Sequence, residues 1–207
     1  MDFVHPVSAV IPGAQGHVLA VLAETSAELN LRTVARLAGV SASQASRVIP
    51  GLVELGLVER REVPPSSLFR LNRHNEAARI VVQLARLRDN VLERIGSAAG
   101  DLPQPPASII VFGSFARREA DRTSDIDVVV VRPDEVDPDD DAWTEGIDRW
   151  RRNAGAIAGN DIEVIEVGLT AAVEKLSHGG QVWDEISRDG VSVFGASLDR
   201  LRDLINA

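Results

Sequence analysis

The sequence contains no cysteine, no tyrosine and only one methionine. Without cysteine the chain cannot form disulfides, use a catalytic thiolate or bind zinc through cysteine ligands. Its four histidines are scattered and lack the spacing of a metal site. No apolar run approaches the ~20 residues of a membrane helix, and the first residues lack a basic region ahead of an apolar stretch. We therefore expect a cytoplasmic protein.

Positive charge is scarce in the second half of the chain. Residues 1–100 hold 11 Lys and Arg against 9 Asp and Glu, whereas residues 101–207 hold 11 against 22, a net charge of −11. Such a contrast between halves suggests two modules with different partners. A chain of 207 residues is long enough to form two small domains, each with its own core.

A helix-turn-helix is predicted in the first module. Residues 31–38 carry apolar side chains at positions i, i+3, i+4 and i+7, which is the stripe of a short helix. Gly39 then ends this helix, and Ser41 caps a second helix that runs to about Leu55. Two short helices joined by a tight glycine turn form a helix-turn-helix.

Residues 56–61 and 68–72 predict two strands of a β-hairpin wing around a Pro-Pro-Ser-Ser tip. The stretch from Leu31 to Asn72 resembles the winged helix-turn-helix of small bacterial transcription regulators, particularly at Ala38-Gly39-Val40-Ser41. The resemblance implies DNA binding, as a homodimer, by side chains of the second helix and arginines of the wing. The implied contacts are Ser43, Gln44, Ser46, Arg47, Arg60, Arg61 and Arg70.

A second interpretation of this module stays open. Winged helices also serve as dimerisation or protein-binding modules, and the excess of positive charge here is small. The module is predicted to cover residues 1–75, and a helical pattern over residues 76–100 predicts a long linker helix. Gly, Asp and Pro residues after position 100 interrupt helical structure, so the second domain is predicted over residues 101–207.

Two carboxylates in the second module occupy one face of a predicted strand. Asp125 and Asp127 precede the apolar run 128–131, and residues two apart in a strand point the same way, about 7 Å apart. Such a pair is repulsive unless a cation lies between the two acids. Oxygen ligands of this kind suit Mg²⁺ together with the phosphates of a substrate. The pair therefore predicts a metal site.

The pattern Gly113-Ser114, ten residues, Asp125-Ile126-Asp127 resembles the signature of nucleotidyltransferases of the DNA polymerase β superfamily. The similarity is greatest to the minimal nucleotidyltransferases, over roughly residues 107–195, although Arg118 stands where those proteins usually have glycine. The resemblance implies a small α/β domain with a mixed sheet. It also implies transfer of a nucleoside monophosphate from an NTP to an acceptor hydroxyl, with Mg²⁺ or Mn²⁺ as cofactor.

The resemblance also assigns roles to individual residues. Gly113 lets the backbone approach the triphosphate, and Ser114, Arg117 and Ser124 are the other implied nucleotide-binding residues. The superfamily uses a third carboxylate from a later strand, here predicted over residues 160–167.

Asp161 and Glu163 share one face of that predicted strand, and either could point at the metals. Glu163 is favoured because apolar residues flank it on both sides. It would be a metal ligand or the general base, so the predicted catalytic and metal-binding residues are Asp125, Asp127 and Glu163.

The predicted fold is therefore α+β: a winged helix-turn-helix, a linker helix and a small α/β nucleotidyltransferase domain. The leading hypothesis is an enzyme that modifies a protein or RNA acceptor and binds DNA. One competing hypothesis is a transcription regulator whose second domain only senses nucleotide. Another is an antitoxin-like protein that modifies a partner toxin. Polymerisation of nucleic acid is disfavoured, because the acidic second half would repel a long polyanion.

Overall fold

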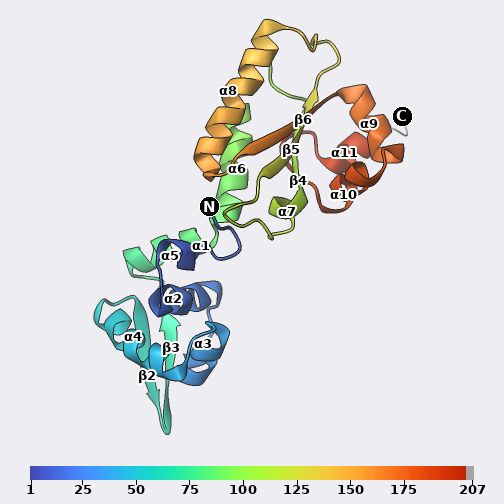
Figure 1. Ribbon diagram of the computed structural model, residues 1–207. Helices are drawn as coiled ribbons and strands as arrows, with labels where there is room; N and C mark the ends of the chain where they lie inside the picture. Colours follow the sequence, from blue (N-terminus) through green and yellow to red (C-terminus); the bar gives the residue numbers. More distant parts are fainter. Residues whose placement is uncertain (204–207) are drawn as a thin grey trace. The chain divides into compact units, whose positions relative to one another are not determined.

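The computed structural model describes residues 1–203, and the chain divides between Leu87 and Arg88 into two units (Figure 1). The first unit comprises residues 4–87 together with Asp2. The second begins at Arg88 and also includes Met1 and Phe3. Within residues 1–203, none of the helices is long and apolar enough to cross a membrane.

The N-terminal unit combines helices with a small antiparallel sheet of order β1-β3-β2. Its helices are α1 (Pro6–Val10), α2 (Ala14–Glu24), α3 (Leu31–Leu37), α4 (Ala42–Glu54) and α5 (Glu76–Ala85). Its strands are β1 (Leu29–Asn30), β2 (Val58–Val63) and β3 (Ser66–Leu71). The hairpin β2–β3 is the predicted wing, and β1 adds a short third strand that was not predicted.

The two helices of the helix-turn-helix begin and end where local chemistry requires. The Asn30 side chain accepts a hydrogen bond from the Thr33 amide (2.9 Å) and caps α3. Gly39 adopts φ +64, a left-handed conformation that suits glycine and turns the chain after α3. At the start of α4, Ser41 and Gln44 form a capping box through bonds of 3.1 and 2.9 Å. These features confirm the predicted helix-turn-helix.

The segment predicted as one linker helix forms two helices, α5 and α6 (Leu87–Ala99). Between them Arg86 has φ −99 and ψ 19, so the backbone leaves the helical conformation there. The two helices bury different faces: α5 packs into the first core, whereas α6 packs into the second unit. Because no single stripe runs through both, Ile80, which fitted the predicted stripe, is 58% exposed.

The C-terminal unit is built on a mixed four-stranded sheet of order β6-β5-β4-β7. Its strands are β4 (Ser108–Phe112), β5 (Ile126–Arg132), β6 (Ile162–Gly168) and β7 (Val191–Gly195). β4 is antiparallel to β5 and β7, and β5 is parallel to β6. Besides α6, the helices are α7 (Gly113–Ala116), α8 (Asp141–Ala158), α9 (Leu169–His178), α10 (Gln181–Asp189) and α11 (Leu198–Asp203).

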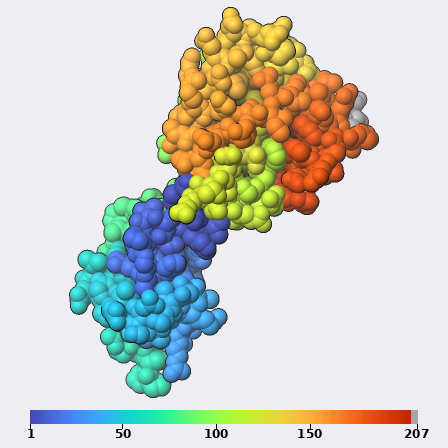
Figure 2. All heavy atoms as spheres, in the orientation of Figure 1, coloured from blue at the N-terminus to red at the C-terminus, as the bar shows by residue number. Residues whose placement is uncertain are grey.

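Helices cover both faces of this sheet (Figure 1). On one face, Ile110, Phe112, Val129 and Val131 pack with residues of α9, α10 and α11. On the other face lie α6 and α8, joined by a hydrogen bond from the Trp150 indole to a carbonyl of α6 (3.1 Å). The outer side of α8 forms part of the surface drawn in yellow and orange in Figure 2. The predicted α+β fold with a mixed sheet is confirmed.

Candidate active site

Asp127 and Glu163 occupy paired positions in the parallel strands β5 and β6. Their side chains therefore lie on the same face of the sheet, while Asp125 stands two residues earlier, just before β5 begins. Glu166 lies on the opposite face, where it forms an ion pair with Arg132 (3.1 Å). The fold thus brings the acid pair and Glu163 to one edge of the sheet.

Asp127 experiences the charges of its neighbours. Burial raises the pKa of Asp127, and the nearby carboxylates of Asp125, Glu163 and Glu185 raise it further, while Arg117 lowers it. Three acids therefore act on Asp127: Asp125 just before β5, Glu163 on β6 and Glu185 on α10. Sequence reasoning missed Glu185, which shares one face of α10 with Asp189, four residues later.

This set of donors suits a hard divalent cation, because carboxylate oxygens are the ligands that Mg²⁺ and Mn²⁺ prefer. A cation here would also offset the charges of Asp125 and Glu163, which add to the effect of burial in raising the pKa of Asp127. Within residues 1–203, however, no three acidic or histidine side chains converge closely enough to hold a metal ion by themselves. Mg²⁺ commonly takes one or two carboxylates and completes its shell with phosphates and water.

Gly113 leaves the space that the Asp127 carboxylate fills. Its φ is +66, and a Cβ at this position would clash with Oδ2 of Asp127 and lie 3.2 Å from Cγ. Any other residue would therefore be strained and would also displace the acid. Ser114 follows within the one-turn helix α7, which connects the end of β4 to the acid pair. The Gly-Ser turn and Asp127 thus meet as the motif predicted.

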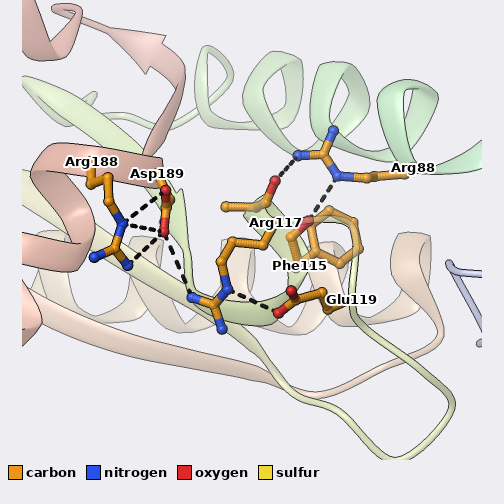
Figure 3. Close-up of polar contacts among 7 residues, drawn as sticks. Arg88, Phe115, Arg117, Glu119, Arg188 and Asp189 are labelled. Carbon is orange, nitrogen blue, oxygen red and sulfur yellow. Dashed lines mark hydrogen bonds and ion pairs between the residues drawn. The ribbon is translucent and has the colours of Figure 1, made fainter.

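Arg117 lies just after α7, between two acids (Figure 3). Its Nε donates to Glu119 (2.9 Å), and its Nη1 lies 3.9 Å from Asp189 of α10. The hydrogen bond to Glu119 raises the pKa of Arg117, so the guanidinium stays charged. Asp189 is also bound by Arg188, and that bond holds the pKa of Asp189 below its usual value.

Arg88 is a buried residue that sequence reasoning missed. From the start of α6 its Nε donates to the Phe115 carbonyl and its Nη2 to the Ala116 carbonyl, both at 2.7 Å (Figure 3). Its guanidinium also lies 5.7 Å from the centre of the Phe115 ring. Arg88 thereby binds the last carbonyls of α7. The sequence contains a signal for it, since Arg88 has helical spacing with the buried Val91, Leu92 and Ile95.

Ser124 belongs to a tightly bonded turn before the acid pair. Its hydroxyl donates to Asp121 (3.1 Å), whose carboxylate also accepts bonds from the Thr123 amide and hydroxyl. The Asn160 side chain donates to the Ser124 carbonyl (2.7 Å) and joins this turn to the start of β6. The structure therefore places Ser124 in the turn directly before Asp125, with its hydroxyl already bonded to Asp121.

The residues predicted to contact DNA lie on α4 and on the wing. Ser43, Gln44, Ser46 and Arg47 are exposed along α4. The side-chain oxygen of Gln44 accepts the Ser41 amide in the capping box, so its NH₂ group remains for another contact. Arg47 has no hydrogen bond or ion pair in the part of the chain that the structure describes.

Each of the three wing arginines is paired with a glutamate. The pairs are Arg60–Glu62 (2.6 Å), Arg70–Glu59 (2.6 Å) and Arg61–Glu28. The arginine side chains are 50–59% exposed, and exposed pairs of this kind are weak. A DNA phosphate at the wing would therefore compete with a carboxylate at every arginine.

Comparison with family models separates the two units. Residues 91–168 match the model described as a nucleotidyltransferase domain. The second unit is a nucleotidyltransferase domain. The match runs from α6 to the end of β6, so it contains the Gly-Ser turn, the acid pair and Glu163. Residues 16–62 match the IclR helix-turn-helix domain, and the first unit is a helix-turn-helix domain of this type.

Similar solved structures include two transcriptional regulators of the MarR family. The one from Silicibacter pomeroyi is 26% identical over 41% of this chain and 57% of that chain, with a TM-score of 0.33. The one from Rhodococcus sp. RHA1 is 26% identical over 42% and 63%, with a TM-score of 0.32. The chain thus spans 57–63% of these regulators' length.

A toxin-antitoxin structure with AMP-PNP is 16% identical over 57% of this chain and 80% of that chain, with a TM-score of 0.34. A search of the curated proteins finds no significant match to the chain.

Proposed function

We propose that the protein is a metal-dependent nucleotidyltransferase that moves a nucleoside monophosphate from an NTP to an acceptor hydroxyl. One observation carries this proposal: Asp127 and Glu163 are paired neighbours on β5 and β6, and the Asp127 carboxylate fills the space left by Gly113. The arrangement lies within the region that matches the nucleotidyltransferase domain. It joins a phosphate-binding turn to carboxylates that can bind a cation and accept a proton.

The roles follow from the chemistry of each group. Gly113 and Ser114 contact the triphosphate through backbone amides and the serine hydroxyl, and Arg117 neutralises phosphate charge. The acceptor oxygen forms a bond to the α-phosphorus, the bond from that phosphorus to the β-phosphate oxygen breaks, and pyrophosphate leaves with the electron pair. Glu163 takes the proton of the acceptor hydroxyl. We assign this role to Glu163 and not Asp161, because Glu163 is paired with Asp127 across β5 and β6, whereas Asp161 precedes β6.

Asp125, Asp127 and Glu163 would hold Mg²⁺ or Mn²⁺ together with phosphates of the NTP and water, because these three carboxylates do not converge closely enough to hold it by themselves. Such a cation supplies positive charge that offsets the charge of the phosphates and polarises the reacting phosphorus. The supporting observation is that Asp127 is partly buried beside Asp125 and Glu163. Burial and these two carboxylates raise the pKa of Asp127. Asp125 and Asp127 are held in register for this task by the turn at Ser124 and by the backbone of β5.

The first unit would bind DNA and bring the enzyme to a site or a partner. Ser43, Gln44, Ser46 and Arg47 of α4 would face base edges. Arg60, Arg61 and Arg70 would contact phosphates after exchanging their glutamate partners. A homodimer is the arrangement that would present two such helices to DNA.

The test combines the purified full-length chain, Mg²⁺ or Mn²⁺ and each α-labelled NTP with candidate protein and RNA acceptors. We expect release of pyrophosphate and transfer of label, both abolished in Asp127→Ala and in Glu163→Gln. Glu166→Gln is the matched control, since this acid is on the same strand but on the opposite face, and it should retain activity.

Absence of pyrophosphate release with every nucleotide and both metals would contradict the proposal. If an NTP then changed the affinity for DNA, the nucleotide-sensing regulator would be the better description. The antitoxin-like role stays a prediction, and label transfer to a partner toxin would support it.

A further inference from the structure

Phe3 contacts the segment that connects the Gly-Ser turn to the acid pair. It belongs to the nucleotidyltransferase unit, although the residues from Val4 onward belong to the helix-turn-helix unit. Its amide donates a hydrogen bond to the Ala120 carbonyl (3.0 Å). Its ring lies edge-to-face against the ring of Phe115 in α7, with the ring centroids 4.7 Å apart and the ring planes at 74°. Phe3 therefore holds two points of the connecting segment.

These contacts are buried. Phe3 is 5% exposed, and Phe115 and Ala120 are fully buried. Ala120 lies between the exposed residues Glu119 and Asp121, so it is the point at which the chain after α7 turns inward. An edge-to-face aromatic pair contributes more than its buried area alone. Removal of the Phe3 ring would open a cavity beside α7.

The connecting segment is also held at its other end, by Asn160. The Asn160 side chain donates to the carbonyls of Asp121 (3.1 Å) and Ser124 (2.7 Å), and it accepts a hydrogen bond from the Met1 nitrogen. Met1 and Phe3 thus support the segment at its start in α7, at Ala120 and, through Asn160, at its end.

The position of α7 determines whether Gly113 and Asp127 fit together. A Cβ at Gly113 would clash with Oδ2 of Asp127, so the backbone of the turn lies directly against the carboxylate. A one-turn helix has almost no stability of its own. A displacement of about 1 Å in an active site can lower the rate about 10²-fold. Contacts that hold α7 therefore bear on nucleotide binding.

We propose that Phe3 is a positioning residue for the nucleotide-binding turn. It lies outside residues 91–168, which match the nucleotidyltransferase domain. Through Phe115 it holds α7, so that the backbone amides of Gly113 and Ser114 are aligned for a triphosphate. The inference rests on the proposed function for its ligand, an NTP. Because Val4 begins the first unit, the residue that positions the turn is joined directly to the helix-turn-helix unit.

The test compares variants of the full-length chain by hydrogen–deuterium exchange without ligand and by binding of mant-ATP, a fluorescent ATP analogue, with Mg²⁺. Phe3→Ala should speed exchange at the amides of Arg117, Arg118 and Glu119, which are bonded to carbonyls of α7, about tenfold. The amides of β4 and β5 should keep wild-type rates. The Kd for mant-ATP should rise about tenfold.

Phe3→Leu should stay close to the wild type in both measurements, because leucine keeps an apolar side chain against Phe115. Val4→Ala is the matched control, since Val4 is the next residue, is 41% exposed and belongs to the first unit. It should leave exchange at α7 and the Kd for mant-ATP unchanged.

Unchanged exchange after α7 in Phe3→Ala would overturn the inference. Faster exchange throughout β4 and β5 would also overturn it, because Phe3 would then stabilise the whole unit, and so would faster local exchange with unchanged mant-ATP affinity. A wild-type protein that binds mant-ATP and releases no pyrophosphate would contradict the proposed function alone, because exchange and binding need no turnover. A wild-type protein that binds no nucleotide would overturn both.

Discussion

Arg118 has a backbone conformation that disfavours its own side chain. Its φ of +65 is the left-handed region, which costs residues with a Cβ about 1–2 kcal/mol. The conformation persists because the Glu119 amide donates to the Ser114 carbonyl (2.8 Å) and closes the turn after α7. The ion pair with Asp89 is exposed, so it offsets little of this cost. Arg118, which stands where the resembling proteins usually have glycine, thus holds a conformation that suits glycine.

Arg118→Gly should therefore raise the free energy of unfolding. Relief of the left-handed strain exceeds the extra entropy of an unfolded glycine, and the expected net gain is up to about 1 kcal/mol. Urea or thermal unfolding measures it. Arg118→Ala is the control, since alanine keeps the strain and removes the ion pair. If both variants stabilise equally, the cause is removal of the repulsion between Arg118 and Arg88 and not the backbone.

Asp127 should make the fold less stable as pH rises. Burial and neighbouring acids raise its folded pKa above the unfolded value of about 3.8. Below the unfolded pKa both states are protonated and Asp127 contributes nothing. Between the two pKa values the folded state holds the proton more tightly, so stability falls with rising pH, and above the folded pKa the penalty is complete.

Asp127→Asn is accordingly expected to raise the Tm at pH 7 in EDTA while abolishing activity. The gain should shrink as pH falls toward 3.8, and thermal unfolding between pH 4 and 8 measures it. Mg²⁺ should raise the Tm of the wild type but not of the variant, because ligand binding stabilises only the protein that binds. A lower Tm for the variant at pH 7 would show that Asp127 is structurally stabilising.

At the scale of elements, α7 is held from two sides. Arg88 of α6 binds its terminal carbonyls, and α10 approaches the residue that follows it through Asp189 and Arg117 (Figure 3). A one-turn helix has almost no stability of its own. The placement of Gly113 and Ser114 beside Asp127 therefore depends on neighbours distant in sequence.

Arg88→Lys should raise the KM for NTP more than it lowers kcat. A lysine ammonium lacks the planar fork that spans both carbonyls, so α7 loses a defined position. Arg88→Met leaves these carbonyls unpaired and should cost about 1–3 kcal/mol of stability. Steady-state kinetics and urea unfolding measure the two effects. Arg94→Met, an exposed position of the same helix, is the control. A fall in kcat with unchanged KM would mean only that less protein is folded.

At the scale of the whole molecule, the chain has two hydrophobic cores, one in each unit. The first core is formed by residues 7–81 and the sheet core on the α9–α11 side by residues 110–201. The charge follows the same division, because the nucleotidyltransferase half is strongly acidic and the helix-turn-helix half is slightly basic.

Local signals in the sequence predicted much of this architecture. Ser41 with Gln44 marks the start of α4, and the spacing from Gly113 to Asp127 marks the turn between β4 and β5. Glu163 was favoured as the third carboxylate from the apolar residues that flank it and the family resemblance, and the structure pairs it with Asp127 across β5 and β6. Each of these signals depends on residues that are neighbours in the chain, or on a period that one strand or helix imposes on its own side chains.

Sequence by itself therefore determined the two domain types, whereas the roles of the acid pair and of Glu163 stay predictions. Only the tertiary structure decided which groups interact. Arg88 binds a carbonyl of α7, Glu185 raises the pKa of Asp127, and the wing arginines form ion pairs with glutamates. It also decided that α5 and α6 separate at Arg86, because each helix buries its apolar face in a different core. Such partners are set by packing between segments that are distant in the chain. The sequence pattern around an exposed charged residue does not indicate which residue will be its partner.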